Sequence, residues 1–345
     1  MTAAVDDPQT VTPAPPQEPD QRPRVRPGDR PDLSDVIFRW AARGAGMVVL
    51  AIMGLVGIFL GYRAFQALKE AGSSFLTTQT WEPDAHNFGI AAILQGTVFI
   101  GLTAICIAVP FAMATALYIS EYAPRRLQRL FISIVDLMAA VPSVVYGLWG
   151  AFFLSENVLG LSRWISTWFG WFPLFSVDGA EPSDPLQSLS VYKSSAFIAG
   201  ITVAMMITPI ASSVMREAFM QAPPGEREGA YALGATKWGM IRAVVLPYGK
   251  GGIIGGTMLG LGRALGETIA VYMIISPVFV FQFHILQSGT NSVSALIALR
   301  RGEASVFGLS ALFAAGLALF LMTLVVNFVA STVVARSRSG ASSDA

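Results

Sequence analysis

The chain has 345 residues, of which 53% are hydrophobic and only 13% are charged. Soluble domains carry roughly 25% charged residues, so this composition excludes an ordinary soluble protein and indicates a membrane protein. The single cysteine, Cys106, excludes an internal disulfide and a cysteine metal cluster, and the net charge of +1 identifies no partner; we expect no metal, cofactor or nucleic acid.

The two ends of the chain differ from the apolar middle. Residues 1–35 contain eight prolines and many charges but no apolar run, so they are not a cleavable signal peptide. They lack the apolar surface needed to offset the entropy of ordering, and we predict a disordered cytoplasmic tail. Residues 36–335 are expected to form the membrane domain, and residues 336–345 a short cytoplasmic C-terminal tail.

Six apolar stretches are long enough to cross a bilayer as helices, which needs about 20 residues. The sequence therefore predicts an all-α integral membrane protein with about six spans. Pro142 and Pro110 are expected to kink the helices that contain them. The predicted spans are Gly44–Phe65, Ile90–Ile119, Leu130–Leu154, Ser195–Met215, Gly251–Ser276 and Val306–Val334.

The basic residues predict the orientation of these spans. If both termini are cytoplasmic, sixteen of the 23 lysines and arginines lie in cytoplasmic segments and six lie outside. Cytoplasmic loops of membrane proteins carry such an excess, so N-in, C-in topology in the plasma membrane is expected. The adjacent pair Arg300 and Arg301 goes against this rule because it falls on the outer side.

The cytoplasmic loop 222–247 has the pattern of two short helices. Pro223 and Pro224 end the preceding helix, and Glu226 and Glu228 then favour the first turn of a new one. Gly234 is expected to adopt the left-handed conformation that stops this helix, and a second helix follows from about Thr236. The physical pattern alone fits either an ordinary surface hairpin or a docking element.

The predicted fifth span contains two opposite charges, Arg263 and Glu267. Their spacing of four residues allows an ion pair along a helix. A charge near the bilayer centre costs about 2.5–3.5 kcal/mol, so both should face protein or a polar path. Either they line an anion pathway or they are a structural pair that fixes helix packing. Glycines at 252, 256 and 260 share one helix face, which favours close approach of a second helix.

The loop resembles the "EAA" loop of ABC importer permeases, which docks as a coupling helix on the ATPase subunit. The pattern is Glu-Ala-Ala, three residues, Gly, nine residues, Ile, one residue, Leu-Pro. Gly229 and Val244 depart from it, by a small and a conservative change. The matching positions are Glu228, Gly229, Ala230, Gly234, Val244, Leu246 and Pro247.

Two further strings resemble the PstC type of phosphate ABC permease. They are Gly255–Val271, GGTMLGLGRALGETIAV, and Ala139–Gly150, AAVPSVVYGLWG. The match runs from the second span onward; the N-terminal tail and loop 155–193 carry no matching motif. In that family the arginine and glutamate of the fifth span are associated with phosphate passage, which the resemblance carries over to Arg263 and Glu267. The PstA-type partner permease is also similar.

The resemblance implies a type I ABC importer permease fold and a transporter subunit rather than an enzyme. The chain has no GxxxxGK[ST] loop, so ATP hydrolysis is expected in a separate subunit. Implied partners are an ATPase subunit dimer, a second permease of PstA type, an extracytoplasmic phosphate-binding protein and membrane lipid. The alternatives are a permease for sulfate, molybdate or phosphonate, an ion-coupled secondary carrier or channel, and a non-transporting scaffold.

Overall fold

The computed structural model describes residues 33–179, 181, 184 and 186–338, and it is almost entirely helical. The chain divides into two units, Met1–Gly54 and Leu55–Ala345. The described part of the first unit is the N-terminal part of helix α1, and all packing described below lies within the second unit. The predicted tail 1–35 falls outside the described residues except for residues 33–35, which are helical.

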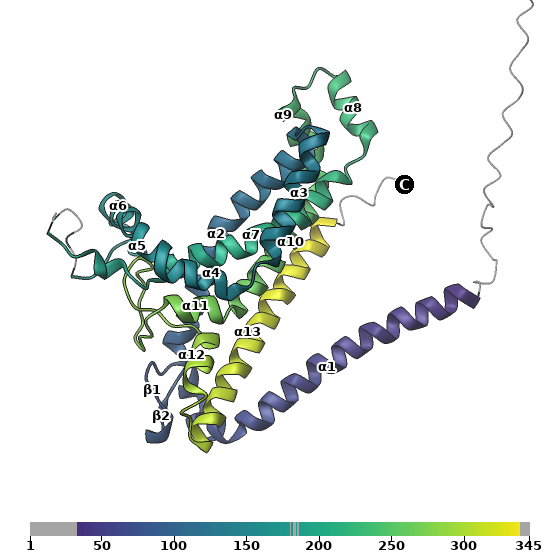
Figure 1. Ribbon diagram of the computed structural model, residues 1–345. Helices are drawn as coiled ribbons and strands as arrows, with labels where there is room; N and C mark the ends of the chain where they lie inside the picture. Colours follow the sequence, from purple (N-terminus) through teal and green to yellow (C-terminus); the bar gives the residue numbers. More distant parts are fainter. Residues whose placement is uncertain (1–32, 180, 182–183, 185, 339–345) are drawn as a thin grey trace, which may run out of the picture. The chain divides into compact units, whose positions relative to one another are not determined.

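Thirteen α-helices lie in the described ranges, together with one two-stranded hairpin (Figure 1). Turns of π-helix extend several of them, at Tyr118–Tyr122, Gly150–Leu154 and Ile241–Val245. The helices are α1 Leu33–Ala71, α2 Ala91–Leu117, α3 Arg125–Ala140, α4 Ser143–Trp149, α5 Ser155–Asn157, α6 Leu159–Phe169, α7 Ala196–Met220, α8 Pro224–Ala232, α9 Lys237–Met240, α10 Leu246–Gly266, α11 Ile269–Ile274, α12 Val293–Arg300 and α13 Val306–Arg338; the strands are β1 Trp81–Glu82 and β2 Asn87–Phe88.

Within the described ranges, four helices are long and apolar enough to cross a membrane as single spans, and they contain α1, α2, α7 and α13. These four correspond to the predicted first, second, fourth and sixth spans. A fifth span is possible if α3 and the segment Ser143–Asn157 are counted together, although the two are bent by 87°. The multi-pass, all-α membrane fold predicted from the sequence is therefore confirmed.

The predicted third and fifth spans are not continuous helices, so these two predictions were wrong in detail. The third breaks after Ala140, where Val141 and Pro142 have extended backbone. Pro142 lacks the amide hydrogen that would continue the helix, so the kink expected there is present. The fifth ends at Gly266, and α10 is not among the helices apolar enough to span by themselves, because it contains Lys250, Arg263 and many glycines.

Helix α7 forms the centre of the packing, with α2 and α10 against it. The glycine face predicted for the fifth span belongs to α10 and packs against α7. A Cβ atom added to Gly252 would lie 2.1 Å from Cβ of Ala218, and one added to Gly256 would lie 2.9 Å from the carbonyl oxygen of Ala211. Only glycine permits this approach, which confirms the role expected from the four-residue repeat.

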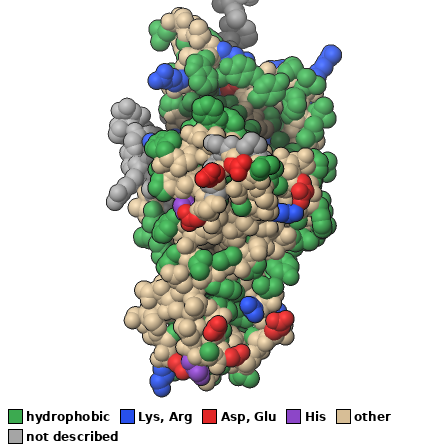
Figure 2. Space-filling model, turned by 90° about the vertical axis from the view of Figure 1, so that its left-hand side faces the viewer, with side chains coloured by type: hydrophobic (Ala, Val, Ile, Leu, Met, Phe, Trp, Pro, Cys, Tyr) green, Lys and Arg blue, Asp and Glu red, His purple; other side chains and the backbone are tan. Residues whose placement is uncertain are grey.

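The two ends of the bundle carry different elements. Figure 1 places α8 and α9 at one end and the β1–β2 hairpin at the other. The hairpin pairs Trp81 with Phe88 in an antiparallel register and packs with Ile90 in an apolar cluster. Figure 2 shows charged side chains gathered at the lower end, at the hairpin's level, and hydrophobic side chains over much of the upper part.

Candidate functional site

The backbone breaks at the glutamate that the sequence analysis singled out. Helix α10 ends at Gly266, Glu267 has extended backbone, and α11 begins at Ile269. Oε1 of Glu267 accepts a hydrogen bond from the amide of Ala270 at 3.4 Å, and the hydroxyl of Ser294 donates to the carbonyl oxygen of Glu267 at 2.7 Å. The carboxylate thus lies at the start of α11, where negative charge is stabilised, and the carbonyl freed by the break is satisfied.

Arg263 and Glu267 do not form the helical ion pair that their spacing allows. Because the helix ends between them, they no longer share a helical face. Glu267 is buried, with 9% of its surface exposed, whereas Arg263 is exposed in the last turn of α10. Among the described residues, Arg263 forms no ion pair or hydrogen bond. Its guanidinium group is therefore available to a ligand.

Both residues line one open hollow of about 510 Å³. Asn327 of α13 also lines it, and its Oδ1 lies 3.7 Å from the position that a Cβ atom on Gly262 would take. Asn327 was not predicted from the sequence, although an amide in an otherwise apolar span was a usable signal. The hollow thus offers a guanidinium, a primary amide and a carboxylate within a mainly apolar wall. The full lining is Ile210, Met258, Leu259, Gly262, Arg263, Gly266, Glu267 and Asn327.

The two strings that carry the phosphate-permease resemblance meet in space. Helix α4, which follows the break at Pro142, packs against α11, which follows the break at Glu267. A Cβ atom on Gly147 would lie 2.8 Å from Cα of Ala270, so the helices are in backbone contact there. Two broken segments therefore support each other beside the hollow, and neither the breaks nor this contact is visible in hydropathy.

Loop 222–247 has the predicted local structure. Helices α8 and α9 are joined through Gly234, whose φ of +83° is left-handed. The hydroxyl of Thr236 accepts a hydrogen bond from the amide of Gly239 and caps α9. Glu226 lies in the first turn of α8, as predicted, whereas Glu228, two residues further on, lies in the second turn. After the π turn, α9 continues directly into α10, so the turn at Gly234 between α8 and α9, called the elbow below, is joined by continuous helix to Arg263.

The loop combines anchored and exposed residues. Val244 and Leu246 are half-buried and pack on a cluster that includes Phe219 of α7. Glu228 and Gly229 are exposed, Ala230 is half-buried, and Pro247 is exposed. Three large apolar side chains also face away from the chain: Tyr231, Leu233 and Trp238, with Leu233 91% exposed. Such a group is typical of a protein contact surface.

A buried ion pair fixes α8 to the transmembrane helices. Nη1 of Arg227 lies 3.0 Å from Oε1 of Glu121, whose side chain is 4% exposed at the end of α2. Nη2 of Arg227 donates to the carbonyl oxygen of Phe219, near the end of α7, at 2.6 Å. Beside this pair, Nζ of Lys237 lies 4.5 Å from the centre of the Tyr122 ring. These contacts tie α8 to the ends of α2 and α7.

Replacing Arg227 by glutamine is expected to destabilise the protein strongly. It leaves the buried Glu121 carboxylate unpaired, which costs about 3–5 kcal/mol. Thermal unfolding of the purified protein measures the loss, and the exchange Glu121→Arg with Arg227→Glu should recover part of it. Arg242→Gln is the matched control, because Arg242 is exposed. Equal losses for the Arg227 and Arg242 variants would contradict an anchoring role.

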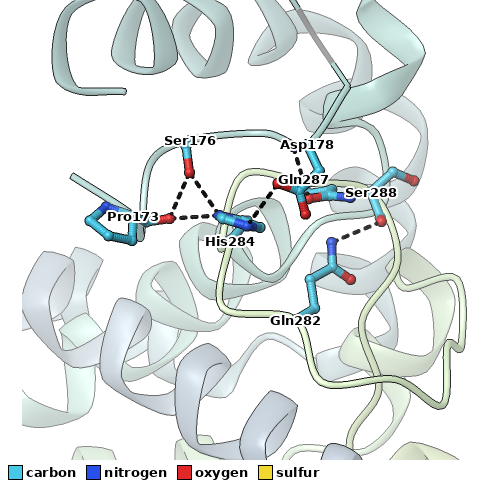
Figure 3. Close-up of polar contacts among 7 residues, drawn as sticks. All are labelled: Pro173, Ser176, Asp178, Gln282, His284, Gln287 and Ser288. Carbon is cyan, nitrogen blue, oxygen red and sulfur yellow. Dashed lines mark hydrogen bonds and ion pairs between the residues drawn. The ribbon is translucent and has the colours of Figure 1, made fainter. Parts of the chain in front are cut away.

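At the opposite end, one histidine ties two loops together (Figure 3). Nδ1 of His284 donates to the carbonyl oxygen of Pro173 at 2.6 Å, and Oγ of Ser176 lies 2.9 Å from the same nitrogen. Nε2 lies 3.2 Å from Oδ1 of Asp178. The segment that follows α11 is thereby fastened to the long loop between α6 and α7, which gives His284 a structural role.

Comparison with known proteins agrees with this architecture. A family model described as "Binding-protein-dependent transport system inner membrane component" matches residues 108–339. The phosphate transport system permease protein PstC 2 of Mycobacterium tuberculosis is 36% identical over 325 residues, which cover 93% of this chain and 96% of that protein. PstC of Mycobacterium leprae is 37% identical over 303 residues, which cover 87% and 92%. PstC of Pasteurella multocida is 35% identical over 305 residues, which cover 88% and 92%.

A solved structure shares the fold. A bacterial ABC transporter involved in the import of the acidic polysaccharide alginate aligns with a TM-score of 0.52 at 19% identity, covering 86% of this chain and 98% of that one. The fold is thus that of a type I ABC importer permease, a membrane component of a transporter. The chain belongs to the family of binding-protein-dependent transport system inner membrane components, and within it to the PstC-type phosphate permeases.

Proposed function

We propose that this chain is the PstC-type transmembrane subunit of an ATP-driven importer that carries inorganic phosphate into the cell. The relationship to phosphate permeases over nearly the whole chain supports the substrate. The observation that carries the proposal within the chain is the unpaired Arg263 guanidinium in the hollow beside Glu267 and Asn327.

The chemistry of the hollow suits a passing oxyanion. Arg263 presents a planar set of donors that matches phosphate in a bidentate geometry. The Asn327 amide adds donors without adding charge. Glu267 lies close enough to line the same space, so its negative charge opposes tight trapping of the anion. Weak, balanced binding of this kind is what a conducting path requires, because a tightly held ion does not leave.

ATP-driven coupling would act through loop 222–247. The exposed Tyr231, Leu233 and Trp238 supply the apolar contact that seats the elbow in a cleft of an ATPase subunit. The residues of the motif, Glu228, Gly229, Ala230, Gly234, Val244, Leu246 and Pro247, form and orient this element. The remaining partners are a second ATPase subunit, a PstA-type permease and an extracytoplasmic phosphate-binding protein. In the plasma membrane, both termini of the chain would be cytoplasmic.

Uptake of radiolabelled phosphate and sulfate in cells without other uptake systems tests the substrate. We expect expression of the complete transporter to restore phosphate uptake and leave sulfate uptake at background. Sulfate, molybdate or phosphonate uptake without phosphate uptake would favour another oxyanion permease. Purification from mild detergent tests the coupling, because a secondary carrier would be recovered without an ATPase subunit.

A further inference from the structure

A second hollow, separate from the proposed anion path, lies between α1, α12 and α13. It has a volume of about 280 Å³, and its lining is apolar apart from Arg301. Leu60 comes from α1, Ile297 from α12, and Leu312, Phe313 and Gly316 from α13. Two of these helices belong to the apolar spans, so the hollow lies where hydrocarbon chains surround the protein. A mainly apolar space of this kind accepts an acyl chain more favourably than water.

Positive charge borders this hollow on the outer side of the predicted topology. Arg301 lines it directly, and the guanidinium carbon of Arg63 lies 5.0 Å from the centre of the Phe313 ring, which is part of the lining. Among the described residues, neither arginine forms an ion pair. The outer position of Arg301 is also the exception to the distribution of basic residues noted from the sequence. Two unneutralised arginines therefore lie beside an acyl-sized space.

We propose that this hollow binds one acyl chain of an anionic phospholipid, whose headgroup phosphate contacts Arg301 and Arg63. The chain fills the apolar lining, and the two guanidinium groups form charge-assisted hydrogen bonds with the phosphate oxygens. A net negative headgroup is preferred to a zwitterionic one, by roughly fivefold for each arginine near the membrane surface. The lipid would thus stabilise the contact between α1 and α13.

Native mass spectrometry of the assembled transporter tests this proposal. The probes are phosphatidylglycerol and phosphatidylcholine with identical acyl chains. The wild-type transporter should retain phosphatidylglycerol in preference, and the double variant Arg63→Gln with Arg301→Gln should lose that preference. Arg300→Gln is the matched control, because Arg300 lines a different hollow together with Glu82, Asp84 and Glu303. Excess inorganic phosphate should not displace the lipid, because the acyl chain supplies much of the binding.

A variant that fills the hollow tests the contribution of its apolar lining separately from that of the two arginines. A Cβ atom on Gly316 would lie 3.7 Å from Ile297 and 3.9 Å from Leu60, which is ordinary contact, so Gly316→Leu should fold and occupy the hollow. We expect it to lower retention of both lipids. Equal retention of the two lipids by the wild-type protein, or equal effects of Arg300→Gln and of the double variant, would overturn the proposal. Displacement by inorganic phosphate would identify a simple anion contact instead.

Discussion

Replacing Arg263 by glutamine is expected to lower ATP-driven phosphate uptake by about 10- to 100-fold while the transporter still assembles. Hydrogen bonds to a charged group contribute about 1.5–3 kcal/mol, which converts to a loss of this order when the charge is removed. The folded chain should tolerate the change, because Arg263 is exposed and its removal leaves no other described residue without an ion-pair or hydrogen-bond partner. Uptake of radiolabelled phosphate into proteoliposomes measures the effect, and recovery of the partner subunits on purification measures assembly.

Two variants, one on α10 and one on α13, serve as comparisons for Arg263→Gln. Lys250 is an exposed cation of α10 that does not line the hollow, so Lys250→Gln should transport normally. Asn327→Ala removes neutral donors from the hollow, and its effect should be smaller than that of Arg263→Gln. Normal uptake by the Arg263 variant would contradict a pathway role and would leave the arginine a purely structural function.

Replacing Gly234 by valine is expected to separate ATP hydrolysis from transport. A β-branched residue at a φ of +83° is strained by about 1–3 kcal/mol. No atom lies within 4 Å of the new Cβ position, so the strain comes from the backbone alone and is relieved by a change in the angle between α8 and α9. ATP hydrolysis should continue if the nucleotide sites are on another subunit, as we propose, whereas phosphate moved for each ATP should fall severalfold.

Two further substitutions decide whether backbone conformation at residue 234 is the cause of the lost coupling. Asparagine tolerates the left-handed region, so Gly234→Asn should retain most of the coupling. Gly225→Val tests bulk alone, since Gly225 lies in α8 and has equally open surroundings without positive φ. Hydrolysis and uptake should be measured on the same proteoliposomes. Full coupling in Gly234→Val would show that the elbow angle is not transmitted to the transport path.

The sequence was most informative where structure depends on neighbouring residues. The elbow at Gly234 follows from local helix-stop chemistry, and the contact of Gly252 and Gly256 with α7 follows from helical periodicity. The assignment to phosphate permeases followed from the strings around Arg263 and Pro142, and the family relationship confirms it. The assignment of Arg263 and Glu267 to the anion path stays a prediction.

The sequence was least informative where a helix stops inside an apolar stretch. Hydropathy does not register the break at Glu267, because the residues on both sides are apolar and the freed backbone groups are satisfied by distant partners such as Ser294. The same break explains why Arg263 and Glu267 do not form the helical ion pair that their spacing allows. Asn327 and the ion pair of Glu121 with Arg227 depend on contacts between residues far apart in the chain, which a single sequence does not reveal.

The side of the membrane on which the elbow lies is the most direct test of the whole mechanism. Cys106 is the only cysteine of the chain, so Cys106→Ser gives a background in which Leu233→Cys adds a single thiol at a 91% exposed position. A membrane-impermeant thiol reagent should label this cysteine in inverted membrane vesicles and leave it unlabelled in intact cells, and bound ATPase subunit should protect it. Labelling in intact cells would place the elbow outside, away from any ATPase, and would contradict ATP-driven import by this chain.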